Sequence, residues 1–451
     1  MTLSGELAGR ASALRFRDLP QAAVTAAKVS LADVLAVSLA AVALEPAAAV
    51  LADHAAAAGG PKEATVIGRA DRLPVAQAAL ANGALAHALD FEDTHDAAKV
   101  HPNAAVVPAV LALAEREGAD GETVLTALAL GADLVCRLGL ALGDRARGRG
   151  WYQPPMLGAM GAALAAARVL GLGADGTVAA MALTPCLFAL PDGFMESPHS
   201  RLRAVRDGFA ARAGVEAADL ARRGLTGAPR PLEGPGGLLD MLGGAGTAAG
   251  LDLGDHGRRF LGAEVAIKRW PSCRGTHGAI AAALAIRDQG IAPAGISAIA
   301  CRVSPPDDML FHPVERKRRP ATAIDAKFSI PFTMATALAH GRVDLASFAP
   351  DRLADPVVTE LAARIHLEAV LDAGDPRTGF TLRLADGRVL DLPMPAPPGP
   401  VAGEARLDAL HEKVAGCLAC VSGGPAAEDL LAAVAGLERT GPGPLLALLS
   451  G

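Results

Sequence analysis

Helical periodicity over most of residues 1–262 is the feature that most constrains the fold of this chain. Apolar residues recur there at helical spacing, and alternating stretches typical of strands are nearly absent. Alanine is abundant and aromatic residues make up only 3% of the chain, which favours close-packed helices over a sandwich or barrel. The clearest predicted helices span residues 19–44, 74–90, 106–117, 123–140, 156–170 and 207–223.

The pattern changes near residue 263. ISAIACRV alternates as a strand, RIHLEAV does so less clearly, and FTLRLADGRVLDL predicts a hairpin with a tight turn at Asp386-Gly387. Helices are expected to start near His277, Asp325 and Asp355, and helical patterns return at 406–420 and 426–437. A chain of 451 residues is too long for one ordinary core. We therefore predict a mainly α protein, with a large all-α domain built from both chain ends (1–262 and 395–451) and an inserted, smaller α+β domain (263–394).

Charge and composition argue against several classes of partner. The net charge is −6, and the short basic run at 315–319 lacks interleaved aromatic residues, so nucleic-acid binding is not expected. The longest apolar run near the N-terminus, 34–44, is too short for a bilayer and follows no cationic leader, which predicts a cytoplasmic protein without membrane contact. The six cysteines are scattered and predict no disulfide framework.

A dense polar segment, DFEDTHDAAKVHP at 90–102, interrupts the apolar helices. Upstream of it and within it, Asn82, His87, Asp90 and Thr94 recur at nearly helical intervals, which predicts one polar helix face. His101 precedes Pro102 and is expected at the N-terminus of the next helix, where the helix dipole favours a neutral imidazole and attracts anions. That setting suits a general base that acts on a carboxylate. The alternative is that His101 caps the helix and the carboxylates form a solvated edge.

The same segment contains a cluster of possible metal ligands, namely Asp90, Glu92, Asp93, His95 and Asp96. On a single helix these side chains are too closely spaced for all of them to converge on one ion. We therefore predict that the protein needs no metal.

Four blocks of sequence occur in one order between residues 80 and 341: NGALAHALDFEDTH followed by HPNAAVVPAVLALAEREGADG, then GWYQPPMLGAMGAALAAARVLGL, KRWPSCRGTH and AKFSIPFTMATALAHG. With these blocks the chain resembles the MmgE/PrpD family, which includes 2-methylcitrate dehydratase, cis-aconitate decarboxylase and iminodisuccinate epimerase. The resemblance implies a helical domain with an inserted α+β domain, an active site in the cleft between them, no cofactor, and assembly as a homodimer.

The resemblance also implies which residues form the site. Asp90, Thr94 and His101 match active-site positions of the first block, and Lys268 matches the lysine that opens the KRWP block. Tyr152 stands where many similar enzymes carry histidine. In a further segment, SRLRAVRDGF, Arg203 stands where many carry lysine. Cys273 and His277 follow Lys268 and are candidate substrate contacts, although packing and helix capping would also explain them.

These parts suit chemistry that develops negative charge beside a carboxylate, which needs a base and cationic groups. We expect a cofactor-independent lyase for a small di- or tricarboxylic acid, most simply a hydro-lyase of the 2-methylcitrate dehydratase type. His101 would be the base or the leaving-group acid, Asp90 would orient it, and Thr94 would hydrogen-bond the substrate. Arg203 and Lys268 would hold carboxylates, and Tyr152 would protonate the departing hydroxide or bind the edge of a carboxylate. The alternatives are a dicarboxylate epimerase in which Cys273 or Tyr152 opposes His101, a decarboxylase of the cis-aconitate type, and a binding protein without chemistry.

Overall fold

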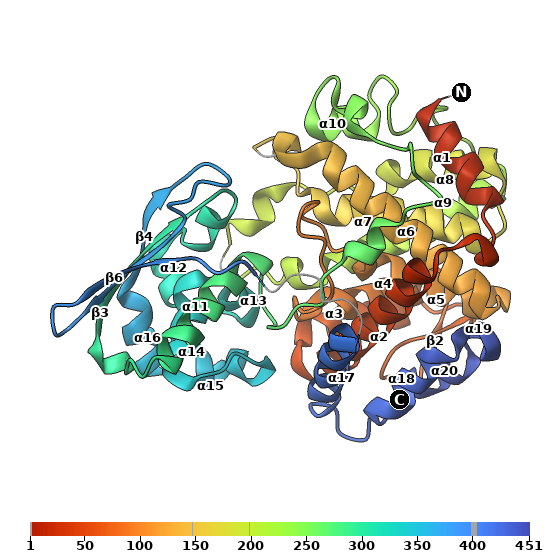
Figure 1. Ribbon diagram of the computed structural model, residues 1–451. Helices are drawn as coiled ribbons and strands as arrows, with labels where there is room; N and C mark the ends of the chain where they lie inside the picture. The colour runs from red at the N-terminus through yellow and green to blue at the C-terminus, as the bar shows by residue number, and fades with distance from the viewer. Residues whose placement is uncertain (1, 147, 198, 398–403) are drawn as a thin grey trace. The chain divides into compact units, whose positions relative to one another are not determined.

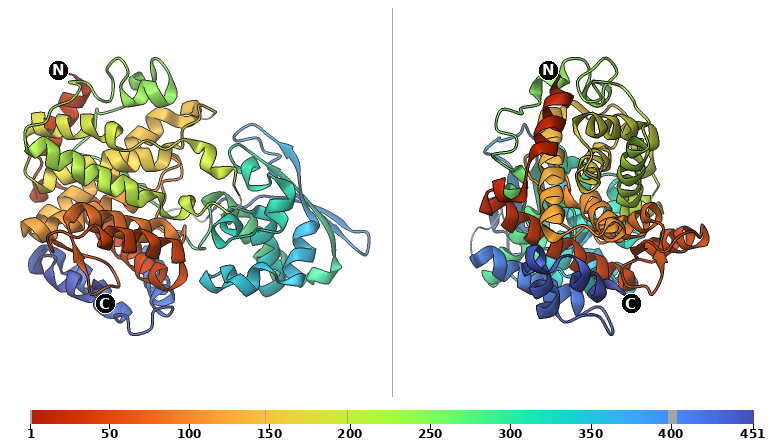
Figure 2. Two further views of the ribbon diagram at one scale, coloured as in Figure 1. Left: turned by 180° about the vertical axis from the view of Figure 1, so that it is seen from behind. Right: turned by 90° about the vertical axis from the view of Figure 1, so that its right-hand side faces the viewer.

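A computed structural model describes residues 2–146, 148–197, 199–397 and 404–451. The chain packs into two compact units (Figures 1 and 2). The first unit comprises Met1–Phe194, Leu202–Ile267 and Pro400–Gly451, so it draws on both chain ends. The second comprises Lys268–Gly399 together with the short segment Met195–Arg201, whose backbone carbonyls accept hydrogen bonds from Arg316.

The first unit is built almost entirely from helices. Its helices in the first part of the chain are α1 (Leu3–Ala13), α2 (Gln21–Leu44), α3 (Pro46–Ala57), α4 (Val75–Ala88), α5 (Asn103–Glu117), α6 (Gly121–Leu142), α7 (Gln153–Val169), α8 (Ala174–Leu187), α9 (Leu202–Arg222) and α10 (Leu238–Gly243). The C-terminal segment adds α17 (Glu404–Leu418), α18 (Ala427–Ala435), α19 (Leu437–Thr440) and α20 (Gly443–Leu449). Two short strands, β1 (Ala64–Thr65) and β2 (Arg72–Leu73), pair antiparallel. The unit was expected to be all-α, and this small strand pair is the difference.

Helix α4 lies at the centre of the first unit and contacts α2, α3, α5 and α9 (Figure 1). It crosses α9 at two glycines, and a Cβ added at Gly83 would lie 2.8 Å from Cα of Gly208. Backbones can approach this closely only where side chains are absent. The alanine-rich sequence therefore produces a tightly packed core, and the crossing sets the C-terminal end of α4 against the first turns of α9.

The C-terminal helices complete this unit. Helix α17 packs along α2, near the opposite end of the chain, and Figures 1 and 2 show the blue C-terminal helices beside the red α2. Lys413 of α17 lies 2.5 Å from the Asp33 carboxylate of α2 and donates a hydrogen bond to the backbone carbonyl of Phe91. This buried pair ties both chain ends to the polar segment at 90–102.

The second unit combines a four-stranded sheet with helices. The sheet has the order β4-β3-β5-β6, where β3 (Ile296–Val303) pairs parallel with β4 (Ile365–Val370) and antiparallel with β5 (Gly379–Leu384), which pairs antiparallel with β6 (Val389–Pro393). The helices are α11 (His277–Asp288), α12 (Val314–Arg318), α13 (Ala323–Lys327), α14 (Ile330–His340), α15 (Pro350–Leu353) and α16 (Pro356–Ala363). Gly387 adopts φ +90° in the turn between β5 and β6, as the hairpin requires.

The mainly α class with a smaller α+β part is confirmed. Two predicted helices are wrong in their extent. Residues 74–90 do not form one helix to the end, because α4 stops at Ala88. The helix expected near Asp325 is only the five-residue α13, since Phe328 leaves helical geometry and Ser329 caps a new helix, α14, by accepting a hydrogen bond from the backbone N–H of Phe332.

Two helical stretches, Gln21–Leu44 and Gly121–Ala146, are long and apolar enough to cross a membrane by length and composition alone. The first is much longer than the eleven-residue run considered in the sequence, because Lys28 and Asp33 interrupt the apolar run but not the helix. In the structure 78% and 94% of their most apolar windows are buried within the protein. Burial of this kind is typical of core helices, which meet the same description, and the absence of membrane contact stays a prediction.

Candidate active site

The polar segment begins where α4 ends. His87 occupies the last turn of α4 and is fully buried, and Asp90 follows in the left-handed region with φ +49°. Aspartate is one of the few residues other than glycine that adopts this conformation readily, and it ends the helix here. The expectation that Asp90 and Thr94 continue one polar helix face is therefore wrong, and the chain between them is irregular.

The other members of that expected face serve different purposes. Asn82 accepts a hydrogen bond from the backbone N–H of Ile67 and donates one to the carbonyl of Thr65, so it fixes the segment around β1. Thr94 pairs through its backbone with Ala266, and its hydroxyl donates to the carbonyl of Val100 at 3.2 Å. The Thr94 hydroxyl thus holds the loop before His101 together, and its lone pairs stay available to accept a hydrogen bond.

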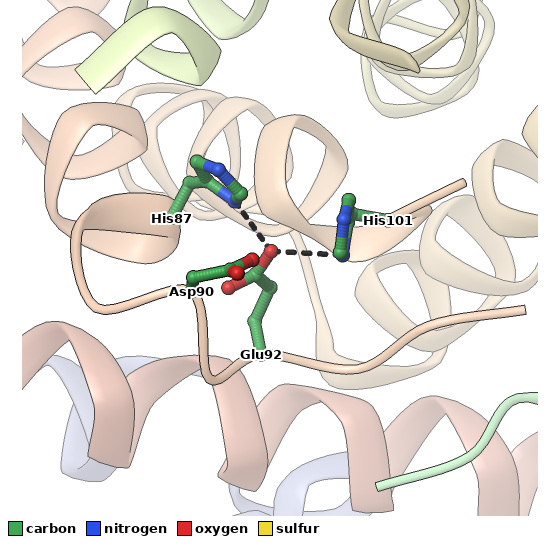
Figure 3. A group of neighbouring side chains, drawn as sticks. All are labelled: His87, Asp90, Glu92 and His101. Atoms are coloured by element: carbon green, nitrogen blue, oxygen red, sulfur yellow. Dashed lines mark hydrogen bonds and ion pairs between the residues drawn. The ribbon is translucent and has the colours of Figure 1, made fainter. Parts of the chain in front are cut away.

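Glu92 lies between two histidine rings (Figure 3). Its Oε1 atom is 2.5 Å from Nδ1 of His87 and 3.0 Å from Nδ1 of His101, and the two ring centroids are 5.2 Å apart. His87 and Glu92 are fully buried, whereas the side chain of His101 is 17% exposed. His101 is therefore the member of this cluster that a substrate can reach. It immediately precedes Pro102, the N-cap of α5, as the sequence predicts.

The contacts of His101 determine which ring nitrogen carries the hydrogen. Nδ1 faces the Glu92 carboxylate at 3.0 Å and the backbone carbonyl of Asp93 at 3.3 Å. A carbonyl and an ionised carboxylate can only accept hydrogen bonds, so Nδ1 must donate. In the neutral ring Nε2 then holds the lone pair and is the basic nitrogen. The orienting carboxylate in this contact belongs to Glu92, whereas the sequence assigned that role to Asp90.

His87 is held neutral. Burial lowers its pKa, and the positive charge of Arg206 acts in the same direction, against the opposing effects of Glu92 and Asp207. Asp207 Oδ2 lies 3.8 Å from Nδ1 of His87 and 3.6 Å from Nε of Arg206. The N-terminal part of α9 thus brings an acid and a guanidinium to the end of α4, beside the Gly83–Gly208 crossing.

Two arginines of α9 lie near Tyr152. The guanidinium carbons of Arg206 and Arg203 are 4.8 and 5.9 Å from the centre of the Tyr152 ring. Arg206 is completely buried. Burial lowers its pKa, but the nearby Tyr152, Asp207, Asp90 and Glu92 raise it by more, so the net shift of the pKa is upward. Tyr152 is the N-cap residue of α7, and its backbone N–H donates to the carbonyl of Leu190. The first unit therefore brings together the predicted Tyr152 and Arg203 with Arg206.

Four side chains lie close enough together to be considered as ligands of a divalent metal. His87, Asp90, Glu92 and His101 each place one possible ligand atom within 4.8 Å of the others. The sequence argument that these carboxylates share a helix and cannot converge is wrong for Asp90 and Glu92. However, ligand atoms around an ion with bonds of about 2.1 Å lie about 3 Å or more apart. The 2.5 Å between Glu92 and His87 fits a hydrogen bond better. That the protein needs no metal stays a prediction.

Three predicted site residues belong to the second unit. Lys268 is the first residue of its long segment, Lys268–Gly399, and is fully buried. Cys273 is half-buried, and its backbone N–H donates to the carbonyl of Lys327. His277 begins α11, where it donates from Nε2 to the carbonyl of Ser272 at 3.3 Å and packs edge-on against Trp270. These contacts give His277 a structural role, and the substrate contacts predicted for Lys268, Cys273 and His277 stay predictions.

Sequence reasoning left four residues of the cluster off its list of site residues, namely His87, Glu92, Arg206 and Asp207. Glu92 lies in the polar segment 90–102 and His87 just before it, but the assumed helix places them on different faces. Arg206 and Asp207 follow Arg203 in α9. This helix contains several other charged residues, so its sequence alone does not mark these two as site residues. Their proximity to His87 depends on the α4–α9 crossing, which no local pattern encodes.

Comparisons with known proteins place the chain among its relatives. Cis-aconitate decarboxylases of Homo sapiens and Mus musculus are each 28% identical to this chain, over 67% of it and over 64% and 63% of their own lengths. The chain thus spans less than two thirds of these relatives. A cis-aconitate decarboxylase-like protein oryM of Aspergillus oryzae is 33% identical over 40% of the chain and 38% of its own length. Models of the MmgE/PrpD N-terminal and C-terminal domains match residues 5–249 and 270–439 in that order, so the chain belongs to the MmgE/PrpD family.

Proposed function

We propose that this protein is a cofactor-independent lyase that removes water from a small di- or tricarboxylic acid carrying a β-hydroxyl group. The observation that supports this proposal most is the setting of His101, whose Nδ1 faces only acceptors while its ring is partly exposed. A neutral imidazole of this kind presents a basic Nε2 to a substrate. Proton removal beside a carboxylate is the step that such a base can perform.

In the proposed reaction Nε2 of His101 takes the proton from the carbon next to a substrate carboxylate. The electron pair of that C–H bond forms the carbon–carbon double bond, and the C–O bond of the β-hydroxyl group breaks. Tyr152 donates its phenolic hydrogen to the departing hydroxide, so that water leaves, and is later reprotonated from solvent. A phenolic O–H can donate its hydrogen to a leaving group, so Tyr152 suits the role of an acid.

Cationic side chains would hold the substrate carboxylates. Arg203 lies beside Tyr152, and a guanidinium can bind a carboxylate through two parallel hydrogen bonds. Arg206 adds a fully buried positive charge near Tyr152 and His87. Lys268 is proposed as a further carboxylate ligand on the basis of the family motif, and Thr94 as a hydrogen-bonding residue through the lone pairs of its hydroxyl.

Decarboxylation is the second candidate, because the curated relatives described above are named cis-aconitate decarboxylases or a protein like them. In that reaction protonated His101 would deliver a proton to carbon while the carboxylate leaves as carbon dioxide. The same base, the same cations and the same class of substrate serve both reactions. Tyr152 replaces a histidine common in similar enzymes of both kinds, so the choice between the two reactions belongs to the experiment below.

Proton NMR in deuterated buffer tests the proposal. Citrate, 2-methylcitrate, citramalate, cis-aconitate and iminodisuccinate are each incubated with the protein. Dehydration creates an alkene signal from a hydroxy acid, and decarboxylation creates an alkene product from cis-aconitate with one carbon fewer. Deuterium at a stereocentre without a new alkene would identify an epimerase instead. A folded protein that changes none of these compounds would contradict the proposed function and favour a binding protein.

A further inference from the structure

We propose that Glu92 is the positioning residue of this site and that it selects the hydrogen-bonding form of His101 in which Nε2 is the base. The proposal rests on the proposed function, because it explains how His101 is prepared for proton transfer. The sequence suggested Glu92 only as one of five possible metal ligands. The proposal also includes His87, which holds Glu92 from the opposite side.

Two oxygen atoms contact Nδ1 of His101. The Glu92 oxygen is nearer, at 3.0 Å, than the Asp93 carbonyl oxygen, at 3.3 Å. Nδ1 hydrogen-bonds to the Asp93 carbonyl, and the nearer Glu92 carboxylate is an ion-pair contact. A negative charge 3.0 Å from Nδ1 attracts its hydrogen, so Glu92 adds to the preference for hydrogen on Nδ1 that the carbonyl alone would give.

His87 fixes the orientation of the Glu92 side chain. Its Oε1 atom also accepts from Nδ1 of His87 at 2.5 Å, and both side chains are fully buried. Burial lowers the pKa of His87, so this ring is neutral and its single hydrogen lies on Nδ1, toward Glu92. The helix crossing at Gly83 and Gly208 places His87 there. Glu92 is thus oriented from the core and cannot rotate away without leaving His87 unpaired.

Burial assigns Glu92 a positioning role and not a catalytic one. Glu92 is completely buried, and its Oε1 atom accepts from Nδ1 of His87 and lies 3.0 Å from Nδ1 of His101, whereas His101 is the partly exposed member (Figure 3). A substrate that reaches His101 meets the imidazole before it meets Glu92. Glu92 therefore acts through His101. A carboxylate that holds an imidazole in the correct form is worth about 10⁴ in turnover in the serine proteases, which sets the scale of the effect.

Nitrogen NMR of the wild-type protein tests the proposal without any assay of activity. The protein is labelled with ¹⁵N-histidine, and the signals of His101 are assigned by their loss in His101→Gln. We expect the neutral ring of His101 to carry its hydrogen on Nδ1. Hydrogen on Nε2 would overturn the proposal, and so would a stoichiometric metal ion bound through Nδ1. Hydrogen on Nδ1 in a protein without lyase activity would contradict the proposed function alone.

Variants of Glu92 measure its effect on turnover. Glu92→Leu removes the acceptor, and we expect a mixed hydrogen position on His101 and a kcat lowered by about 10² to 10⁴ with KM changed less than about threefold. Glu92→Gln keeps the size of the side chain but replaces the carboxylate by an amide, the exchange that costs about 10⁴ in turnover in the serine proteases, so kcat should stay low in this variant too. Glu428→Leu, at an exposed glutamate of α18, is the matched control and should behave as wild type. An unchanged kcat in folded Glu92→Leu would contradict the proposal.

Discussion

Four carboxyl groups are buried around the candidate site, namely Asp90, Glu92, Asp93 and Asp207. Buried carboxylates are costly unless hydrogen bonds or opposite charges stabilise them. His87 and His101 contact Glu92, and Asn103 donates to Asp93 at 2.6 Å, while burial nevertheless raises the pKa of Asp93. A substrate with two or three carboxylates adds further negative charge. At the scale of residues, cationic side chains are therefore the groups whose removal should affect binding most.

Arg203 provides the corresponding prediction. Replacing Arg203 by Ala should weaken substrate binding by about 1.5 to 3 kcal/mol, the usual range for a hydrogen bond to a charged group, and raise KM about 10- to 150-fold. Arg203→Lys should recover only part of this loss, because a point charge replaces a planar fork. Arg212→Ala, on the same helix and one-third exposed, is the control. Steady-state kinetics give the comparison, and an unchanged KM in Arg203→Ala would remove this residue from the site.

The sequence identified His101 because an imidazole before a proline and an apolar helix is a local pattern. Glu92 could not be assigned a role in the same way, since its position depends on where α4 ends. That end is set by the left-handed conformation of Asp90, which periodicity does not reveal. The roles predicted for Asp90, Thr94 and Lys268 came from family resemblance, and they stay predictions that need kinetic tests.

At the scale of elements, the crossing of α4 and α9 determines where His87, Arg206 and Asp207 meet. Helical periodicity predicted both helices, although it placed their ends one to five residues away from those observed. It could not predict the crossing, because two glycines in separate helices carry no information about their contact. A Cβ at Gly208 would lie 2.4 Å from the carbonyl oxygen of Leu80, which belongs to the backbone and cannot turn aside.

Gly208→Ala should therefore force α4 and α9 apart. We expect a loss of about 1 to 3 kcal/mol in the free energy of unfolding, as overpacking usually costs, together with reduced turnover. Gly9→Ala in α1 is the matched control, because a Cβ there meets no atom within 4 Å and alanine favours a helix by up to about 1 kcal/mol. Urea denaturation of both variants measures the difference. Equal stability of the two would show that the crossing tolerates a methyl group.

At the scale of the whole molecule, the two ends of the chain meet in one helical unit. Asp33 of α2 pairs with Lys413 of α17, and the same lysine contacts the ring and carbonyl of Phe91 beside the site. Composition and periodicity predicted that both ends build this unit but not which residues join them. A homodimeric assembly and a cytoplasmic location stay predictions.

Asp33 gives this junction a pH dependence. Burial raises the pKa of Asp33 to about 6, although Lys413 opposes the shift. The folded protein then keeps a proton that the unfolded chain releases near pH 4, so the stability from this carboxyl is complete below about pH 4 and is lost as the pH rises to about 6. Asp33→Asn should remove a dependence on the order of 3 kcal/mol between these pH values. Urea unfolding at pH 4 and pH 7 measures it, and parallel profiles for wild type and variant would contradict this assignment.

The most direct test of the central claim is the rate of deuterium transfer to the substrate carbon, followed by proton NMR, in wild type and His101→Ala. His366→Ala, at an exposed position of β4, serves as the control. If His101 is the base, the wild type and the control should form product and exchange at equal rates, while a folded His101→Ala should be slower by about 10² to 10⁴. Wild-type rates in folded His101→Ala would contradict the assignment of His101 as the base.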